Sequence, residues 1–365
     1  MANYIIIAGL PGSGKTSLAH QLEKQYEAAF LTSDSYKHTE TNQNGEKIIV
    51  TDFEQMKKDA DELLEKETSV VLMASNLTEK RRRFLLRDIS GFRHKRICYL
   101  TLREYSACMQ ELEKRGSTIA LTLQDSLYRS FETPYYCEGW DEIHLVYPDH
   151  NETSKGKSEG YYRNFLNYGQ DNPHHLESLG EHLKMTGDKL LSTGDPELIT
   201  AGYLHDIGKP FARTYGEPGE DGVRIAHYFG HAGVGAYESL FFDMEGLDKL
   251  RISWLISQHM KPLDWRRSGS KNGAEKAKRR WGEDLFYEIR LLSEADESSK
   301  IKSPGVSEVK QMPEEEKIEE LREKLRDYYG TAMVSGMPMA VVDLAKLENM
   351  DDDEILEEAE KNHIR

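Results

Sequence analysis

Short apolar runs alternate with amphipathic stretches over the first 115 residues of the chain. The predicted strands are four β-branched or aliphatic runs, at 4–8, 28–32, 69–74 and 96–102. Apolar residues recur at helical spacing after the first run, through Leu18 and Leu22, and again near 53–66, 78–88 and 104–115. Strands that alternate with helices predict an α/β domain with a parallel sheet and helices on both faces.

The pattern changes beyond Val146. Residues 148–160 have no periodicity and are rich in turn formers, which is typical of a linker. From about 174 to 300 the apolar spacing is helical, and 313–327 predicts a charged amphipathic helix ahead of a short acidic one. The second domain is therefore expected to be all-α.

These changes divide the 365 residues into four parts. We expect an α/β domain at 1–147, a linker at 148–165, a helical domain at 166–304 and a helical C-terminal extension at 305–365. Two domains of this size agree with the usual ~100–200 residues per domain.

Composition narrows the class of protein. Hydrophobic residues make up 38%, which is enough to build buried cores. No stretch approaches the ~18 apolar residues that span a bilayer, and no secretory leader is recognisable. Three cysteines without a CxxC pair suggest neither a disulfide framework nor a thiolate zinc site, so we expect a soluble, cytoplasmic protein.

The net charge of −16 argues against a generic nucleic-acid coat protein. Residues 301–365, with 9 basic and 17 acidic side chains, contribute half of it. Because the other 300 residues are only mildly acidic, they can still form local basic surfaces. The charged tail is a candidate dimer contact or a helical pair that packs on the second domain.

A phosphate-binding loop follows the first predicted strand. Gly9-Leu-Pro-Gly-Ser-Gly-Lys-Thr16 fits the P-loop pattern, in which backbone N–H groups and a helix N-terminus face nucleotide phosphates. Lys15 is expected to reach the β- and γ-phosphates of ATP, and the Thr16 hydroxyl to bind Mg²⁺. The residues expected to bind the nucleotide are Gly9, Pro11, Gly12, Ser13, Gly14, Lys15, Thr16 and Ser17.

Polar residues near other strand ends could handle the acceptor. Asp34 follows the second strand, where it could take a proton from an attacking hydroxyl or merely cap a turn. A basic run at 80–83 and the group Lys114-Arg115-Gly116 could contact phosphates or form solvated faces.

Together these pieces resemble the phage-type polynucleotide 5′-hydroxyl kinases over roughly 1–147. The resemblance rests on the P-loop, Asp34 with Tyr36, Asn76-Leu77, Lys114-Arg115-Gly116, and 131–134 ahead of 138–141. It implies that Asp34 is the general base and that Arg115 stabilises the transferring phosphoryl group. Lys37 stands where the family has a phosphate-contacting arginine. The residues expected to contact the acceptor here are Lys37, Asn76 and Arg83.

Histidines concentrate in the second half, where a His-Asp pair lies in Leu-His205-Asp206-Ile-Gly-Lys209. The remaining imidazole and carboxylate candidates on helical segments are His182, His231, His259 and Asp296. Such donors suit Mn²⁺, Fe²⁺, Ni²⁺ or Zn²⁺ with an activated water.

This pattern resembles the HD-domain metal phosphohydrolases over about 174–300. The resemblance implies one or two ions held by those six positions, and a phosphate-contacting role for Lys209. His175, seven residues before His182, could contact substrate phosphate or be a surface residue.

A kinase joined to an HD phosphohydrolase resembles nucleic-acid end-healing enzymes of the bacterial or phage-infected cytoplasm. The resemblance implies 5′-OH ends and 3′-phosphate or 2′,3′-cyclic-phosphate ends, with RNA favoured, as partners. Two alternatives stay open: a nucleoside or nucleotide kinase with an HD nucleotidase, and a non-catalytic nucleotide sensor. A log-linear salt dependence of single-strand binding would separate the first alternative from end healing.

Overall fold

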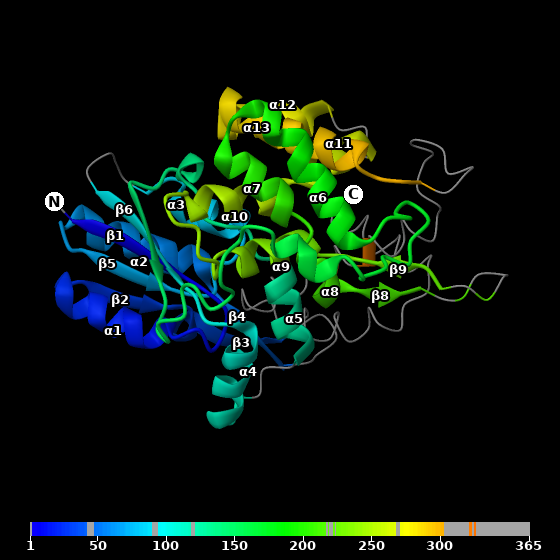
Figure 1. The fold of residues 1–365 in the computed structure, drawn as a ribbon. Coiled ribbons are helices and arrows are strands. Elements are labelled where there is room, and N and C mark those ends of the chain that lie inside the picture. Colours follow the sequence, from blue (N-terminus) through cyan, green and yellow to red (C-terminus); the bar gives the residue numbers. More distant parts are fainter. Residues whose placement is uncertain are drawn as a thin grey trace. The chain divides into compact units, whose positions relative to one another are not determined.

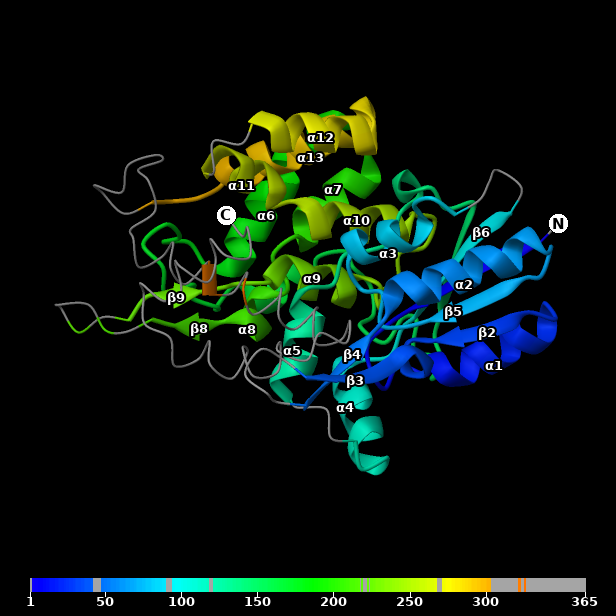
Figure 2. The same cartoon turned by 180° about the vertical axis from the view of Figure 1, so that it is seen from behind.

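The computed structural model describes residues 2–41, 47–89, 94–117, 121–216, 224–267 and 271–302, together with the single residues 218, 222, 321, 322 and 325. It divides into two compact units (Figures 1 and 2). Of the described residues, the first comprises those within 2–128 and 138–150 together with 321, 322 and 325, and the second those within 129–137 and 151–302. The helical extension expected at 305–365 lies outside the described residues, apart from those at 321, 322 and 325.

The first unit is built on a five-stranded parallel sheet in the order β2-β5-β1-β6-β7. Its strands are β1 (Asn3–Ala8), β2 (Ala29–Thr32), β5 (Val70–Met73), β6 (Lys95–Thr101) and β7 (Glu142–Val146). Strand β1 is buried on both faces, as its uninterrupted aliphatic run predicts. The α/β parallel sheet is thus confirmed.

Helices cover the two faces of this sheet. They are α1 (Lys15–Gln25), α2 (Phe53–Glu65) and α3 (Glu79–Leu86); the unit also contains α4 (Tyr105–Lys114) and α5 (Leu121–Arg129). Ala19 and Leu22 of α1 pack against Ile5 and Ile7 on one face. On the other face, the Tyr4 hydroxyl donates to the carbonyl of Leu85 in α3.

Three strands of this unit were not predicted. The antiparallel hairpin β3 (Lys37–Thr41) and β4 (Lys47–Thr51) stands apart from the main sheet. Its first strand is polar at every position, so hydrophobic patterning gives no signal there. Strand β7 lies at the sheet edge and is only partly buried, which explains its weak apolar pattern.

The second unit is helical, as predicted. Its helices are α6 (Leu179–Leu190), α7 (Pro196–Leu204), α8 (Lys209–Ala212), α9 (His231–Ser239), α10 (Lys249–Gln258), α11 (Lys261–Arg267), α12 (Lys271–Trp281) and α13 (Glu283–Ser298). A short ladder joins β8 (Thr214–Tyr215) to β9 (Ala226–His227). Ser178 and Glu181 form a capping box that starts α6, and Asp195 caps α7.

The segment Arg129–Cys137, which lies inside the predicted first domain, packs within the helical unit. The Phe131 ring meets the Tyr237 ring edge-on at 5.1 Å, and the hydroxyls of Thr133 and Ser253 are 2.6 Å apart. No helix among the described residues is long and apolar enough to cross a membrane.

Candidate functional sites

The phosphate loop connects β1 to α1 at the carboxyl edge of the parallel sheet. Strand β1 has β5 on one side and β6 on the other, so the loop lies where chain order reverses, the usual ligand position in such sheets. Gly12 and Gly14 have φ of 83° and 97°, which disfavours other residues. A Cβ on Gly12 would lie 2.5 Å from the carbonyl oxygen of Cys108.

Side chains from distant elements hold this loop. Ser13 is buried, and its hydroxyl lies 2.6 Å from the hydroxyl of Thr101 at the end of β6. Arg103 donates to the Gly12 carbonyl at 2.7 Å and forms a two-pronged ion pair with Asp149. These supporting residues were missed because they carry no local motif.

Lys15 is turned onto its own loop. Its ammonium donates to the carbonyls of Gly9 at 3.0 Å and Leu10 at 2.9 Å. Burial lowers the pKa of Lys15 to about 8, while the nearby Asp34 carboxylate opposes this and the Arg115 guanidinium adds to it. The structure therefore brings Asp34 and Arg115 within electrostatic reach of the P-loop lysine.

The two proposed catalytic groups of this unit are exposed and paired locally. Asp34 follows β2 and lies 2.5 Å from the ammonium of Lys37. Arg115 ends α4 and pairs with Glu111 at 2.6 Å. Both pairs join residues close in sequence on an exposed surface, so they cost little to open.

Asn76 and Arg83, both predicted to contact the acceptor, lie in different surroundings. Asn76 is buried, has a positive φ of 49°, and donates to the Ile7 carbonyl at 2.8 Å. Arg83 is half exposed on α3 and lies 3.7 Å from Glu79. The neighbouring Arg82 is fully buried and forms a bidentate pair with Glu138 at 2.6 and 2.8 Å. Of these residues, only Arg83 offers a charge to solvent.

The HD-type site gathers its donors from five elements of the helical unit. His182 comes from α6, His205 and Asp206 from the end of α7, His231 from the start of α9, His259 from the end of α10, and Asp296 from α13. All six side chains are buried.

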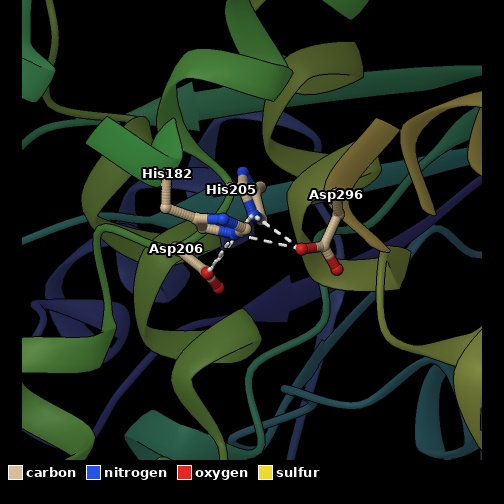
Figure 3. A group of neighbouring side chains, drawn as sticks. All are labelled: His182, His205, Asp206 and Asp296. Carbon is tan, nitrogen blue, oxygen red and sulfur yellow. Dashed lines mark hydrogen bonds and ion pairs between the residues drawn. The ribbon is translucent and has the colours of Figure 1, made fainter. Parts of the chain in front are cut away.

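Four of these residues form the first donor group, and their side chains point toward one another (Figure 3). The Nε2 atoms of His182 and His205 are 3.2 Å apart. Asp206 Oδ2 lies 3.3 Å from both, and Asp296 Oδ1 lies 3.0 Å from His182 Nε2.

The second donor group shares Asp206. Its Oδ1 lies 3.0 Å from His231 Nε2 and 3.6 Å from His259 Nε2, and these two nitrogens are 3.3 Å apart. The two oxygens of Asp206 thus face different donor groups. Each of the two donor groups could hold a divalent ion, and Asp206 would contribute to both.

Backbone carbonyls set the tautomer of three histidines. Nδ1 of His205, His231 and His259 lies 2.6–2.9 Å from the carbonyl oxygen three residues earlier in each case. Because a carbonyl only accepts, Nδ1 must carry the proton when the ring is neutral. Each Nε2 lone pair is then directed into the donor cluster.

His182 has a carboxylate in that position instead. Glu177, which the sequence analysis missed, is buried with Oε1 3.4 Å from His182 Nδ1 and 2.8 Å from His175 Nδ1. Its Oε2 accepts from the backbone N–H of Ile301 at 2.8 Å. His175 thus shares the Glu177 carboxylate with His182. Burial lowers the pKa of His175 to about 4, and the positive charge of Lys209 acts in the same direction.

Two lysines border the donor groups. Lys209 is buried and donates to Asp206 Oδ2 at 2.7 Å and to Gln170 at 2.8 Å. Lys300 lies 3.4 Å from Asp296 and pairs with Glu297 at 2.8 Å. Only Lys209 was predicted.

The charges in the cluster match a cation. Burial alone would lower the pKa of His182, but the carboxylates of Asp206, Asp296 and Glu177 raise it to about 10. Burial would raise the pKa of Asp206, but the adjacent His205 and Lys209 hold it well below its usual range. Asp296 Oδ1 is buried without a hydrogen bond. Ionised carboxylates around inward-facing imidazole nitrogens fit a divalent metal.

Comparisons with known proteins agree with this division. Residues 5–119 match the family described as "AAA domain", and residues 174–301 match the family described as "HD domain". Among curated proteins, no significant match to the chain is found.

Solved structures also show similarity. A gluconokinase from Sinorhizobium meliloti 1021 is 16% identical with a TM-score of 0.31, and covers 40% of this chain and 83% of its own. An unliganded sugar kinase from Janibacter sp. HTCC2649 is 19% identical with a TM-score of 0.32, and covers 40% and 86%. The two family matches place a P-loop kinase-like domain and an HD domain in one chain.

Proposed function

We propose that the protein heals nucleic-acid ends. Its P-loop unit phosphorylates a 5′-OH end with ATP and Mg²⁺, and its HD unit removes a 3′-phosphate or 2′,3′-cyclic phosphate, preferably from RNA. The observation that carries the proposal is that one chain holds both a phosphate loop with Asp34 near Lys15 and a buried donor cluster centred on Asp206. The two chemistries act on opposite ends of a broken strand.

In the kinase unit, the acceptor hydroxyl attacks the γ-phosphorus of ATP and the bond to the ADP oxygen breaks. Asp34 takes the hydroxyl proton after releasing Lys37. Lys15 leaves its loop carbonyls for the phosphate oxygens, and Arg115 leaves Glu111 to neutralise charge on the transferring group. Thr16, exposed in the first turn of α1, would offer its hydroxyl to the Mg²⁺ that accompanies ATP.

In the HD unit, a divalent metal would supply an activated water, and the two donor groups around Asp206 would hold it. Lys209 places a buried positive charge beside Asp206, where it would bind a phosphate oxygen of the substrate. Glu177 and the three carbonyl-bound histidines keep the donor atoms directed inward.

The test uses a short RNA with a 5′-OH and a 2′,3′-cyclic phosphate, incubated with ATP, Mg²⁺ and Mn²⁺. Intact mass spectrometry reports both ends at once. Asp34→Ala is expected to abolish only the 5′ reaction, and Asp206→Ala only the 3′ reaction. If either change silenced both ends, the two-site proposal would be wrong. If neither end reacted while free nucleotides were hydrolysed, the small-molecule alternative would replace it.

A further inference from the structure

A strongly basic segment lies between the donors His259 and Asp296. Residues 260–282, which contain α11 and α12, carry eight Lys and Arg against two Asp and Glu, a net charge of +6 in a chain of −16. Helix α11 begins two residues after His259, and α13, which follows α12, carries Asp296. The basic segment therefore follows His259 directly in the sequence and is joined to Asp296 through α13.

Buried aromatic residues fix the orientation of α12. Ala277 and Trp281 are buried, and the Trp281 ring contacts the Trp254 ring edge-on at 5.3 Å and lies 5.8 Å from the Trp265 ring. Lys276 and Arg279 are exposed on the same helix. The packing thus leaves Lys276 and Arg279 directed toward solvent, whereas Lys278 pairs with Glu283 at 3.1 Å.

Two exposed cations elsewhere in the helical unit are held in ion pairs. Lys184 pairs with Asp188, and Arg290 with Glu294, one turn along the same helix in each case. Within the described ranges, Lys276 and Arg266 have no carboxylate within ion-pair distance, and Arg279 donates to the Glu275 backbone carbonyl. Their charge is therefore available to an anionic partner.

We infer that the exposed cations of α11 and α12, namely Arg266, Lys276 and Arg279, form a docking face that binds the phosphodiester backbone of the strand whose 3′ end enters the HD-type site. The inference rests on the proposed function. A polyphosphate strand fits because a regular series of phosphates releases counterions when Lys and Arg neutralise it. This inference also explains why an acidic protein contains one strongly basic segment.

The test measures binding of a 3′-phosphorylated oligoribonucleotide by fluorescence anisotropy over a series of salt concentrations. The full-length protein is compared with Lys276→Glu/Arg279→Glu and with a matched control, Lys184→Glu/Lys189→Glu on α6, which has the same change in net charge. Loss of two phosphate contacts is expected to reduce the slope of log affinity against log salt by about 1.4, at roughly 0.7 per contact for single strands. The control pair is expected to retain the wild-type slope.

A kinetic comparison excludes a general loss of folding. The ratio of kcat/KM for the oligonucleotide to that for a 2′,3′-cyclic mononucleotide is expected to fall about tenfold in the α12 variant, mainly through KM. If the wild type acted on mononucleotides alone, the proposed function would fail. If it processed RNA and both double variants kept the same ratio and salt slope, the docking face would be rejected while the proposed function stood.

Discussion

The phosphate loop and the HD-type site are both proposed to act on phosphate groups, but they differ in which parts of the chain form them and in how exposed those parts are. The loop is made of backbone held by positive-φ glycines, and its proposed acid–base group, Asp34, is 69% exposed. The HD-type site is made of buried side chains, with His182 and His205 fully inaccessible. At the phosphate loop, the charged side chains must still move toward a bound nucleotide. At the HD-type site, the charged side chains are already close together.

The two sites also differ in the interactions that hold their charged side chains in place. Around the loop, Asp34 and Arg115 pair with residues three and four positions away at the surface, and such pairs contribute little to stability. Around Asp206, every donor is supported by a carbonyl, a carboxylate or a lysine. We therefore expect single substitutions to act locally in the kinase unit but to spread through the HD-type cluster.

The largest effect should come from Asp206, because both donor groups depend on it. Asp206→Asn is expected to remove all tightly bound metal and phosphohydrolase activity, whereas His231→Ala should remove one ion of two. Metal content by mass spectrometry, with kinase activity as a folding control, checks this. Equal losses in the two variants would show that the groups do not hold separate ions.

The comparison also explains what the sequence could predict. The loop at 9–16 is contiguous, and its strand and helix were predicted with it. Its supports, Thr101 and Arg103, lie about ninety residues away and carry no motif. The six HD donors are predicted from the resemblance to the HD-domain phosphohydrolases, and the structure brings them together.

Other features depend on tertiary contact. Glu177 looks like an ordinary surface residue before a helix, and only the approach of His182 and Ile301 makes it a buried support. Asn76 is predicted to contact the acceptor, but its side-chain amide donates to the Ile7 carbonyl of β1. Such roles follow from the burial of a polar group, which local sequence does not encode.

A second variant tests the one buried charge pair described in the kinase unit. Arg82→Met leaves Glu138 buried without its partner, and we expect a loss of about 3–5 kcal/mol in that unit's unfolding free energy. Arg83→Met, which changes the exposed neighbour, should cost under about 1 kcal/mol. Urea unfolding followed alongside both activities measures this. Similar costs for both variants would contradict the assigned burial.

Glu177 provides a finer test of the HD-type site. Glu177→Gln keeps the size of the side chain but removes the charge opposite His182 Nδ1. Loss of such supporting carboxylates typically weakens metal binding by about 10–100-fold, and we expect a change in that range. Chelator competition with Co²⁺, which also reports ligand geometry through its absorption spectrum, measures it. Glu294→Gln, on the exposed side of α13, is the control and should leave affinity unchanged.

The smallest expected effect is the uptake of a proton by Lys15 when a nucleotide binds to the phosphate loop. Burial lowers the pKa of Lys15 to about 8, so at pH 9 most of the free protein carries a neutral amine there. Nucleotide phosphates favour the ammonium, so binding at pH 9 should take up close to one proton, about the limit for a single group. Below pH 7 the lysine is already charged and the uptake should vanish. Calorimetry in buffers of different ionisation enthalpy measures the uptake. Its persistence in Lys15→Met would assign the proton to another group.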